Sequence, residues 1–181
     1  MRTVFLTIGP QGAGKSTFCK KAVTQHPSII WISRDEILTR LFGTVWLNPY
    51  TGGHQLAFEC MWRIVQKHLR KPDAVLLLDC WNGFGSDRAL ICRELRLRGA
   101  ECIIGLHFVI SEKACVKWRA LKELDTKGIS ADEYAHDYRL FQAQPIEVEQ
   151  GFDSIIRIQP ALVSDYSFLL GSGEQLCLPG C

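Results

Sequence analysis

The chain has 181 residues, of which 47% are apolar and 22% charged, and its formal net charge is +2. This balance is typical of one globular domain that is large enough to bury a core. So small a net charge argues against a nucleic-acid coat protein or a polybasic membrane anchor, although a local basic groove is compatible with it. The eight scattered cysteines form no C-x-x-C pair, which favours reduced thiols and a cytoplasmic location.

Short β-branched runs alternate with longer helical stretches along the chain. The predicted elements are, in chain order, strand 3–8, helix 15–25, strand 29–33, helix 35–42, helix 54–69, strand 74–78, helix 86–98, strand 102–109, a helix from 111 onward, helix 131–142 and strand 154–158. Ser86 is expected to cap its helix and Gly99 to end it. Continuous apolar strands between helices indicate a parallel sheet covered on both faces, an α/β three-layer sandwich.

Residues 1–160 are expected to form this single domain, and residues 161–181 a tail with a short element in it. The apolar opening VFLTI is only five residues long and is predicted to be a strand. No apolar run approaches the roughly 18 residues that a membrane span requires. The sequence therefore predicts no contact with a membrane.

Residues 9–17, GPQGAGKST, match the phosphate-binding pattern G-x-x-x-x-G-K-[ST] completely. A buried strand is predicted before the loop and a helix after it, which argues against a chance match in a glycine-rich turn. The contacts to ATP are expected from Gln11, Gly12, Ala13, Gly14, Lys15, Ser16 and Thr17. Lys15 can reach the β- and γ-phosphates, and the Ser16 hydroxyl can hold Mg²⁺.

Two aspartates lie at predicted strand ends, where ligands gather in an open α/β sheet. Asp35 follows the second strand and is the better candidate to orient an attacking hydroxyl and accept its proton; the alternative is a helix cap. Asp79 ends the third strand and could assist Mg²⁺ or hold substrate, or it could fix the neighbouring loop by hydrogen bonds. Arg119 could close over the transferring phosphate, although a solvated helix face is the simpler interpretation.

The segments TIGPQGAGKST (7–17), WISRDEI (31–37), LLLDCWN (76–82) and WRALKE (118–123) together resemble the kinase domain of 5′-hydroxyl polynucleotide kinases. These belong to the P-loop kinases, with AAA-type ATP-binding domains, that also include zeta-toxin-like enzymes. The resemblance covers roughly residues 2–159. It implies a five-stranded parallel sheet of adenylate-kinase type with a small helical lid at about residues 118–133.

The resemblance also implies roles for particular residues. Asp35 would be the general base toward the 5′-hydroxyl, and Arg119 the lid arginine that contacts the phosphates. Asp79 and Asn82 keep the Asp-x-x-Asn pattern of the family, and with Arg34 they are the candidates for substrate binding. ATP and Mg²⁺ would be the cofactors.

The chain departs from the family pattern on the acceptor and lid side. Leu38 stands where many members carry an arginine, and Arg34 or Arg40 could substitute for it only in part. A second lid arginine is expected near Lys122 and Glu123, and a lysine lacks the bidentate fork of an arginine.

Three functional hypotheses follow. The leading one is an ATP-dependent kinase that phosphorylates the 5′-hydroxyl of DNA or RNA. Trp46, Tyr50 and Trp81 lie near the acceptor side and could stack bases, although packing in the core or in loops is slightly favoured for them. In the second, the acceptor is a small metabolite, a nucleoside or an antibiotic. In the third, the chain binds ATP without catalysis. The sequence does not determine the oligomeric state.

Overall fold

The computed structural model describes residues 1–122 and 131–171 of the chain. Within this range, five parallel strands form one sheet in the order β2-β3-β1-β4-β5. The strands are β1 Thr3–Ile8, β2 Ile30–Ser33, β3 Val75–Asp79, β4 Cys102–Phe108 and β5 Ser154–Ile158. The prediction of a five-stranded parallel sheet in an α/β fold is confirmed.

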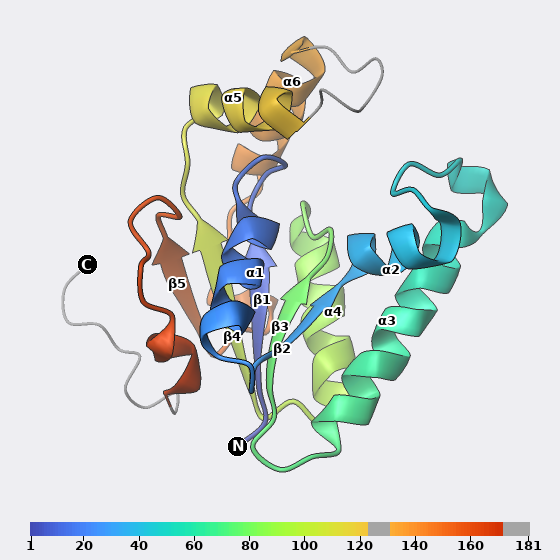
Figure 1. The fold of residues 1–181 in the computed structure, drawn as a ribbon, viewed down its shortest axis with the longest axis vertical. Coiled ribbons are helices and arrows are strands. Elements are labelled where there is room, and N and C mark those ends of the chain that lie inside the picture. The colour runs from blue at the N-terminus through green and yellow to red at the C-terminus, as the bar shows by residue number, and fades with distance from the viewer. Residues whose placement is uncertain (123–130, 172–181) are drawn as a thin grey trace.

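Helices cover both faces of the sheet, as Figure 1 shows. They are α1 Lys15–Gln25, α2 Arg34–Phe42, α3 Gly53–Leu69, α4 Gly85–Leu97, α5 Glu112–Lys122 and α6 Ala131–Gln142. Side chains of α3 and α4 pack on one face, and side chains of α1 pack on the other. Because β1 alternates between the faces, Leu6 belongs to the first core layer and Phe5 to the second, and both are fully buried.

Most predicted element bounds agree with the structure to within a residue, and those of α1, α6 and β5 agree fully. The predicted cap of α4 is wrong: the helix begins at Gly85, so Ser86 lies inside its first turn. Phe84 is the N-cap residue, and its backbone N–H donates to the Asp87 carboxylate. Gly99 has a φ of 98° just beyond this helix, as a terminating glycine requires.

The carboxyl ends of the strands, where β1 leads into α1, lie beneath α5 and α6 (Figure 1). Tyr166 and Leu169 are buried in the same core layer as Phe18 of α1, and the centres of the Phe18 and Tyr166 rings are 4.8 Å apart. Leu169 belongs to the 3-10 helix η4, Ser167–Leu170. The segment after β5 therefore contributes to the core as far as it is described. Residues 123–130 of the expected lid and residues 172–181 of the tail lie outside the described residues.

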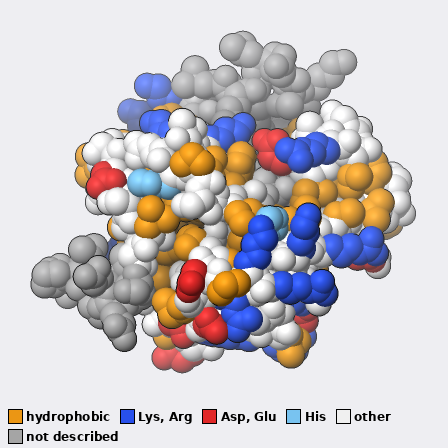
Figure 2. Space-filling model, turned by 60° about the horizontal axis from the view of Figure 1, so that its bottom comes forward, with side chains coloured by type: hydrophobic (Ala, Val, Ile, Leu, Met, Phe, Trp, Pro, Cys, Tyr) orange, Lys and Arg blue, Asp and Glu red, His pale blue; other side chains and the backbone are white. Residues whose placement is uncertain are grey.

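The surface does not carry one uniform charge on the face shown in Figure 2, where acidic and hydrophobic side chains lie among the Lys and Arg side chains. None of the helices that the structure describes combines the length and apolarity needed to cross a membrane. The described cysteines are all free, and Cys177 and Cys181 lie outside the described residues.

Candidate active site

The glycine-rich loop connects the buried strand β1 to the start of α1. Gly12 and Gly14 have φ values of 80° and 83°, in the left-handed region that favours glycine. The Lys15 ammonium group donates to the carbonyl oxygens of Gly9, at 2.8 Å, and Pro10, at 2.9 Å. Lys15 is thus folded back into its own loop, with its charge held where a phosphate can replace the two carbonyl groups.

Helix α5 packs directly against this loop. A Cβ atom added to Gly12 would lie 2.6 Å from the carbonyl oxygen of Cys115, and one on Gly14 would lie 2.9 Å from Cζ3 of Trp118. Both distances are too short for a real side chain. Glycine is therefore required at these two positions for two reasons: the positive φ of the loop and the close approach of α5.

Asp79 joins the loop to the sheet. Its carboxylate accepts a hydrogen bond from the Ser16 hydroxyl at 2.8 Å and another from the Thr7 hydroxyl at 3.0 Å. Asn82 donates to the backbone carbonyl of Thr7 at 2.7 Å and to that of Cys80 at 3.1 Å. Asp79 and Asn82 are both buried, at 7% and 3% exposure. This network orients the Ser16 hydroxyl and one carboxylate oxygen toward each other.

The Ser16–Asp79 pair fits Mg²⁺, because hydroxyl and carboxylate oxygens are the ligands that this ion prefers. Among the described residues, no group of three or more His, Cys, Asp or Glu side chains is placed to hold a metal. Such a sparse protein ligand set is usual where a nucleotide's phosphates supply further oxygens. Burial lowers the pKa of Lys15, and the carboxylates of Asp79 and Asp35 oppose that shift.

Asp35 lies in the first turn of α2, facing the loop. The helix cap is Ser33, whose hydroxyl accepts from the backbone N–H of Glu36, so Asp35 is not the cap. The Asp35 carboxylate accepts from the Arg34 guanidinium at 2.8 Å and 3.2 Å. The Arg34 guanidinium also lies 5.6 Å from the centre of the Phe58 ring. Arg34 is thus held by two contacts, one of which is the ion pair with Asp35.

One cavity of about 320 Å³ brings the two halves of the predicted site together. From the loop side it is lined by Gly9, Gln11, Gly12, Lys15 and Ser16. From the opposite side it is lined by Arg34, Asp35, Val45, Trp46, Asp79, Cys80, Trp81 and Asn82. We call it the acceptor cavity. The sequence-predicted residues at the ends of β1, β2 and β3 therefore do meet in space.

Two of the three suggested aromatic residues line the acceptor cavity. Trp46 and Trp81 do so and are 50% and 38% exposed, whereas Tyr50 is 94% exposed and lies outside the lining. The Trp81 ring lies over Gly83, where an added Cβ would come within 2.4 Å of Cζ2. Gly83 therefore provides the space that the indole occupies.

The residues at which this chain departs from the family pattern lie in different places in the structure. Leu38 is fully buried in the core beneath α2 and does not line the acceptor cavity. Arg40 lines a separate cavity with Trp31 and His68, so of the two arginines only Arg34 lies at the acceptor side. The backbone of Arg119 belongs to α5, but its side chain, like that of Lys122, lies outside the described residues, and so does Glu123.

Arg88 is a residue that the sequence reasoning did not identify. It is fully buried in α4 and donates five hydrogen bonds, to neutral oxygens only. The acceptors are the carbonyls of Asn82, Gly83, Gln144 and Pro145 and the side chain of Gln150. Arg88 thereby ties the loop after β3, which lines the acceptor cavity, to the segment that follows α6. Its type alone gave no signal, because most arginines are exposed.

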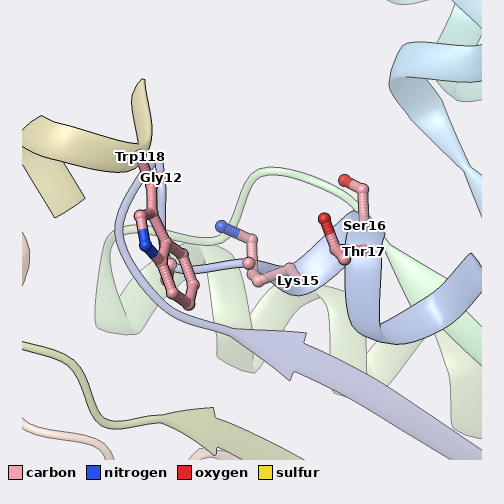
Figure 3. A pocket seen from close by; sticks show the side chains of 7 residues that line it. Gly12, Lys15, Ser16, Thr17 and Trp118 are labelled. Atoms are coloured by element: carbon pink, nitrogen blue, oxygen red, sulfur yellow. The ribbon is translucent and has the colours of Figure 1, made fainter. Parts of the chain in front are cut away.

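A second cavity, of about 210 Å³, lies on the other side of the phosphate loop. Residues 12–17 line it together with Trp118, as Figure 3 shows. In that view the Trp118 indole extends from α5 beside the loop, while Ser16 and Thr17 lie further along, in the first turn of α1. We call it the donor cavity. Trp118 belongs to the segment WRALKE that resembles the family, but the sequence indicated no role for it.

A family model described as an AAA domain matches residues 4–146 of the chain. No curated protein sequence matches this chain. Several solved structures are similar, although their sequences are distant.

A chain of the Pnkp1/Rnl/Hen1 RNA repair complex shares 18% identity and a TM-score of 0.68 over 84% of this chain, which spans 46% of that one. A fungal RNA kinase shares 16% identity and a TM-score of 0.58 over 93% of this chain and 80% of its own. The tunicamycin resistance protein of Deinococcus radiodurans shares 14% identity and a TM-score of 0.60 over 93% and 92%. At identities this low, the structural similarity establishes a common fold.

Proposed function

The chain belongs to this AAA-domain family of P-loop kinases, and we propose that it transfers the γ-phosphate of ATP to the 5′-hydroxyl of a polynucleotide. The observation that carries the proposal is the acceptor cavity. It joins the phosphate loop to a carboxylate, Asp35, that has no structural duty as a helix cap. Phosphoryl transfer requires this combination of a phosphate cradle and a base near the incoming hydroxyl.

On the donor side, the amides of residues 11–17 would surround the phosphates, and Lys15 would exchange its two carbonyl partners for phosphate oxygens. The exchange would preserve the hydrogen bonding of a partly buried ammonium group. Ser16 and Asp79 would hold Mg²⁺, which when bound neutralises charge on the phosphates. Thr7 would keep Asp79 in position from beneath.

On the acceptor side, Asp35 would orient the hydroxyl and accept its proton. The hydroxyl oxygen forms a bond to the γ-phosphorus while the bond from that phosphorus to the departing ADP oxygen breaks. Arg34 holds the Asp35 carboxylate by one oxygen, Oδ1, which leaves Oδ2 available for this role. That Arg119 closes over the transferring phosphate stays a prediction.

Two observations support a polynucleotide as the acceptor. Trp46 and Trp81 offer indole rings in the lining of the acceptor cavity, and bases stack on such rings whatever their sequence. Two of the similar structures are described as an RNA repair complex and an RNA kinase. A small hydroxyl compound is the alternative acceptor, since the Deinococcus radiodurans resistance protein has a similar fold as well.

The test is transfer of labelled phosphate from γ-labelled ATP to a panel of 5′-hydroxyl DNA, 5′-hydroxyl RNA, nucleosides and antibiotics. We expect transfer to the oligonucleotides. Asp35→Asn should lower kcat by about 100-fold or more, the usual contribution of a general base, while ATP affinity stays within about twofold. Glu36→Gln is the matched control, because Glu36 is the next residue of α2 and does not line the acceptor cavity.

Each alternative predicts a different result. Transfer to small compounds but to no oligonucleotide would replace the polynucleotide with a metabolite acceptor. Full activity of Asp35→Asn would remove Asp35 from the mechanism. ATP binding without transfer to any member of the panel would support a binding protein.

A further inference from the structure

The phosphate loop lies between two cavities that share three of its residues. Gly12, Lys15 and Ser16 line both the donor cavity and the acceptor cavity. A nucleotide whose phosphates bind at these residues can direct its terminal phosphate toward Asp35 only from the acceptor side. Its base and sugar must then lie on the side of the donor cavity.

Among the residues that the structure describes, Trp118 is the only aromatic side chain in the lining of the donor cavity. Its ring is held close to the loop: an added Cβ on Gly14 would lie 2.9 Å from Cζ3 of the indole and 3.6 Å from Cβ of Pro160. Trp118 follows Cys115 by one helical turn, and the carbonyl oxygen of Cys115 would lie 2.6 Å from a Cβ added to Gly12. Helix α5 therefore places the indole against the loop.

We propose that Trp118 stacks on the base of the donor nucleotide. The proposal rests on the donor half of the proposed function and is independent of the acceptor. An indole offers a flat, polarisable face at low entropic cost, and each stacked base is stabilised enough to change affinity by about 5- to 150-fold. The remaining lining, residues 12–17, is the part that would surround the phosphates in the proposed function. Trp118 is thus the part of the described cavity that can recognise a base.

Two other roles for Trp118 predict different effects of its removal. If the ring only supports the shape of the loop, its loss weakens every ligand that binds the loop, including one without a base. If the ring fills the site and must be displaced, its loss strengthens nucleotide binding. Of the three roles, only stacking predicts a loss of binding affinity that is confined to ligands that carry a base.

The experiment is calorimetric titration of the full chain with Mg²⁺-ATP and, separately, with Mg²⁺ and inorganic tripolyphosphate. The variants are Trp118→Ala and Trp118→Phe, with Trp62→Phe as a control. Trp62 packs against Arg98, 4.6 Å from the guanidinium, and lines neither cavity. We expect Trp118→Ala to lose about 5- to 150-fold in ATP affinity and to stay within about twofold for tripolyphosphate. Trp118→Phe, which keeps an aromatic face, should retain most of the ATP affinity.

Three results would overturn the proposal: equal losses for ATP and tripolyphosphate, a gain in ATP affinity for Trp118→Ala, or unchanged affinity for both ligands. A melting curve of each variant in the absence of ligand excludes a folding defect, and the Phe variant serves as the test if the Ala variant is unstable. No acceptor is present in the titration. A chain that binds ATP through Trp118 but transfers no phosphate would therefore contradict the proposed function and leave this inference intact.

Discussion

Replacing Gly12 with alanine tests the contact between α5 and the phosphate loop. The φ of Gly12 is 80°, so any L side chain is strained there, and the new Cβ would meet the carbonyl oxygen of Cys115 at 2.6 Å. Ordinary contacts begin at 3.4 Å, so the helix or the loop must move by about 0.8 Å. Gly43 has a φ of 73° and no atom within 4 Å of an added Cβ. Gly43→Ala therefore measures the cost of φ without the collision.

The two variants should differ clearly in stability. Positive φ in an alanine costs about 1 kcal/mol net, since the substitution also restricts the unfolded chain. The collision at Gly12 adds about 2 kcal/mol more, as for an extra methyl group in a packed site. At about 2–4 °C per kcal/mol for a chain of this size, Tm should fall by about 2–4 °C for Gly43→Ala and by about 6–12 °C for Gly12→Ala.

Thermal unfolding followed by circular dichroism measures both shifts, and ATP binding supplies an independent readout. A displacement of the loop by about 0.8 Å should weaken ATP by tenfold or more in Gly12→Ala and leave Gly43→Ala unchanged. If the two variants lose the same stability, α5 does not approach the loop as closely as described. The account of how Cys115 and Trp118 are held at the loop would then be refuted.

Three further substitutions and one alkylation experiment test other parts of the site. Asp79→Asn removes a charge and should raise the Mg²⁺ concentration needed for ATP binding by about tenfold, measured by Mg²⁺ titration at fixed ATP. Arg88→Met leaves several buried carbonyl oxygens without a donor and should lower Tm by about 6–12 °C in thermal unfolding. Gly83→Ala should displace the indole of Trp81 and raise the KM for the acceptor by about fivefold, with the KM for ATP unchanged, in steady-state kinetics. Burial raises the pKa of Cys80 to about 12, so at pH 8 this thiol should resist iodoacetamide, as mass spectrometry can determine.

Contrary results are equally specific. An unchanged Mg²⁺ requirement in Asp79→Asn would show that Ser16 needs no carboxylate beside it. An Arg88→Met protein as stable as its parent would mean that water replaces the lost donors. A change in the KM for ATP in Gly83→Ala would show that the two sides of the loop are not separate, and alkylation of folded Cys80 would show that its burial is transient.

Local signals in the sequence were sufficient for most of the fold. The glycines around Lys15 and the glycine at position 99 mark helix boundaries through their conformational freedom, and the apolar strands mark the sheet. Asp35 and Asp79 could be assigned to one site because parallel strands all end at the same edge of a sheet. The cap of α4 was not predicted, because Phe84 has no side-chain oxygen that would mark it as an N-cap residue, and the helix begins one residue before Ser86.

The rest of the site depends on contacts between residues far apart in the sequence. The packing of Trp118 against Gly14 follows from where α5 crosses the loop, and no local pattern states that crossing. Arg88 is buried because carbonyl groups from three separate segments converge on it, with partners up to 62 positions away. Leu38 stands where many family members carry an arginine, but it belongs to the core because α2 turns that position inward.

The hydrogen bonds of Arg88 have a mechanical consequence for α5 and α6. They connect the carbonyls of Gln144 and Pro145, just beyond α6, to the rim of the acceptor cavity at Asn82 and Gly83. That end of the helical pair is therefore anchored to the sheet, whereas its other end leaves β4 through the short connection at residues 109–111. Loss of Arg88 should therefore disturb the end of α6 and the rim of the acceptor cavity together.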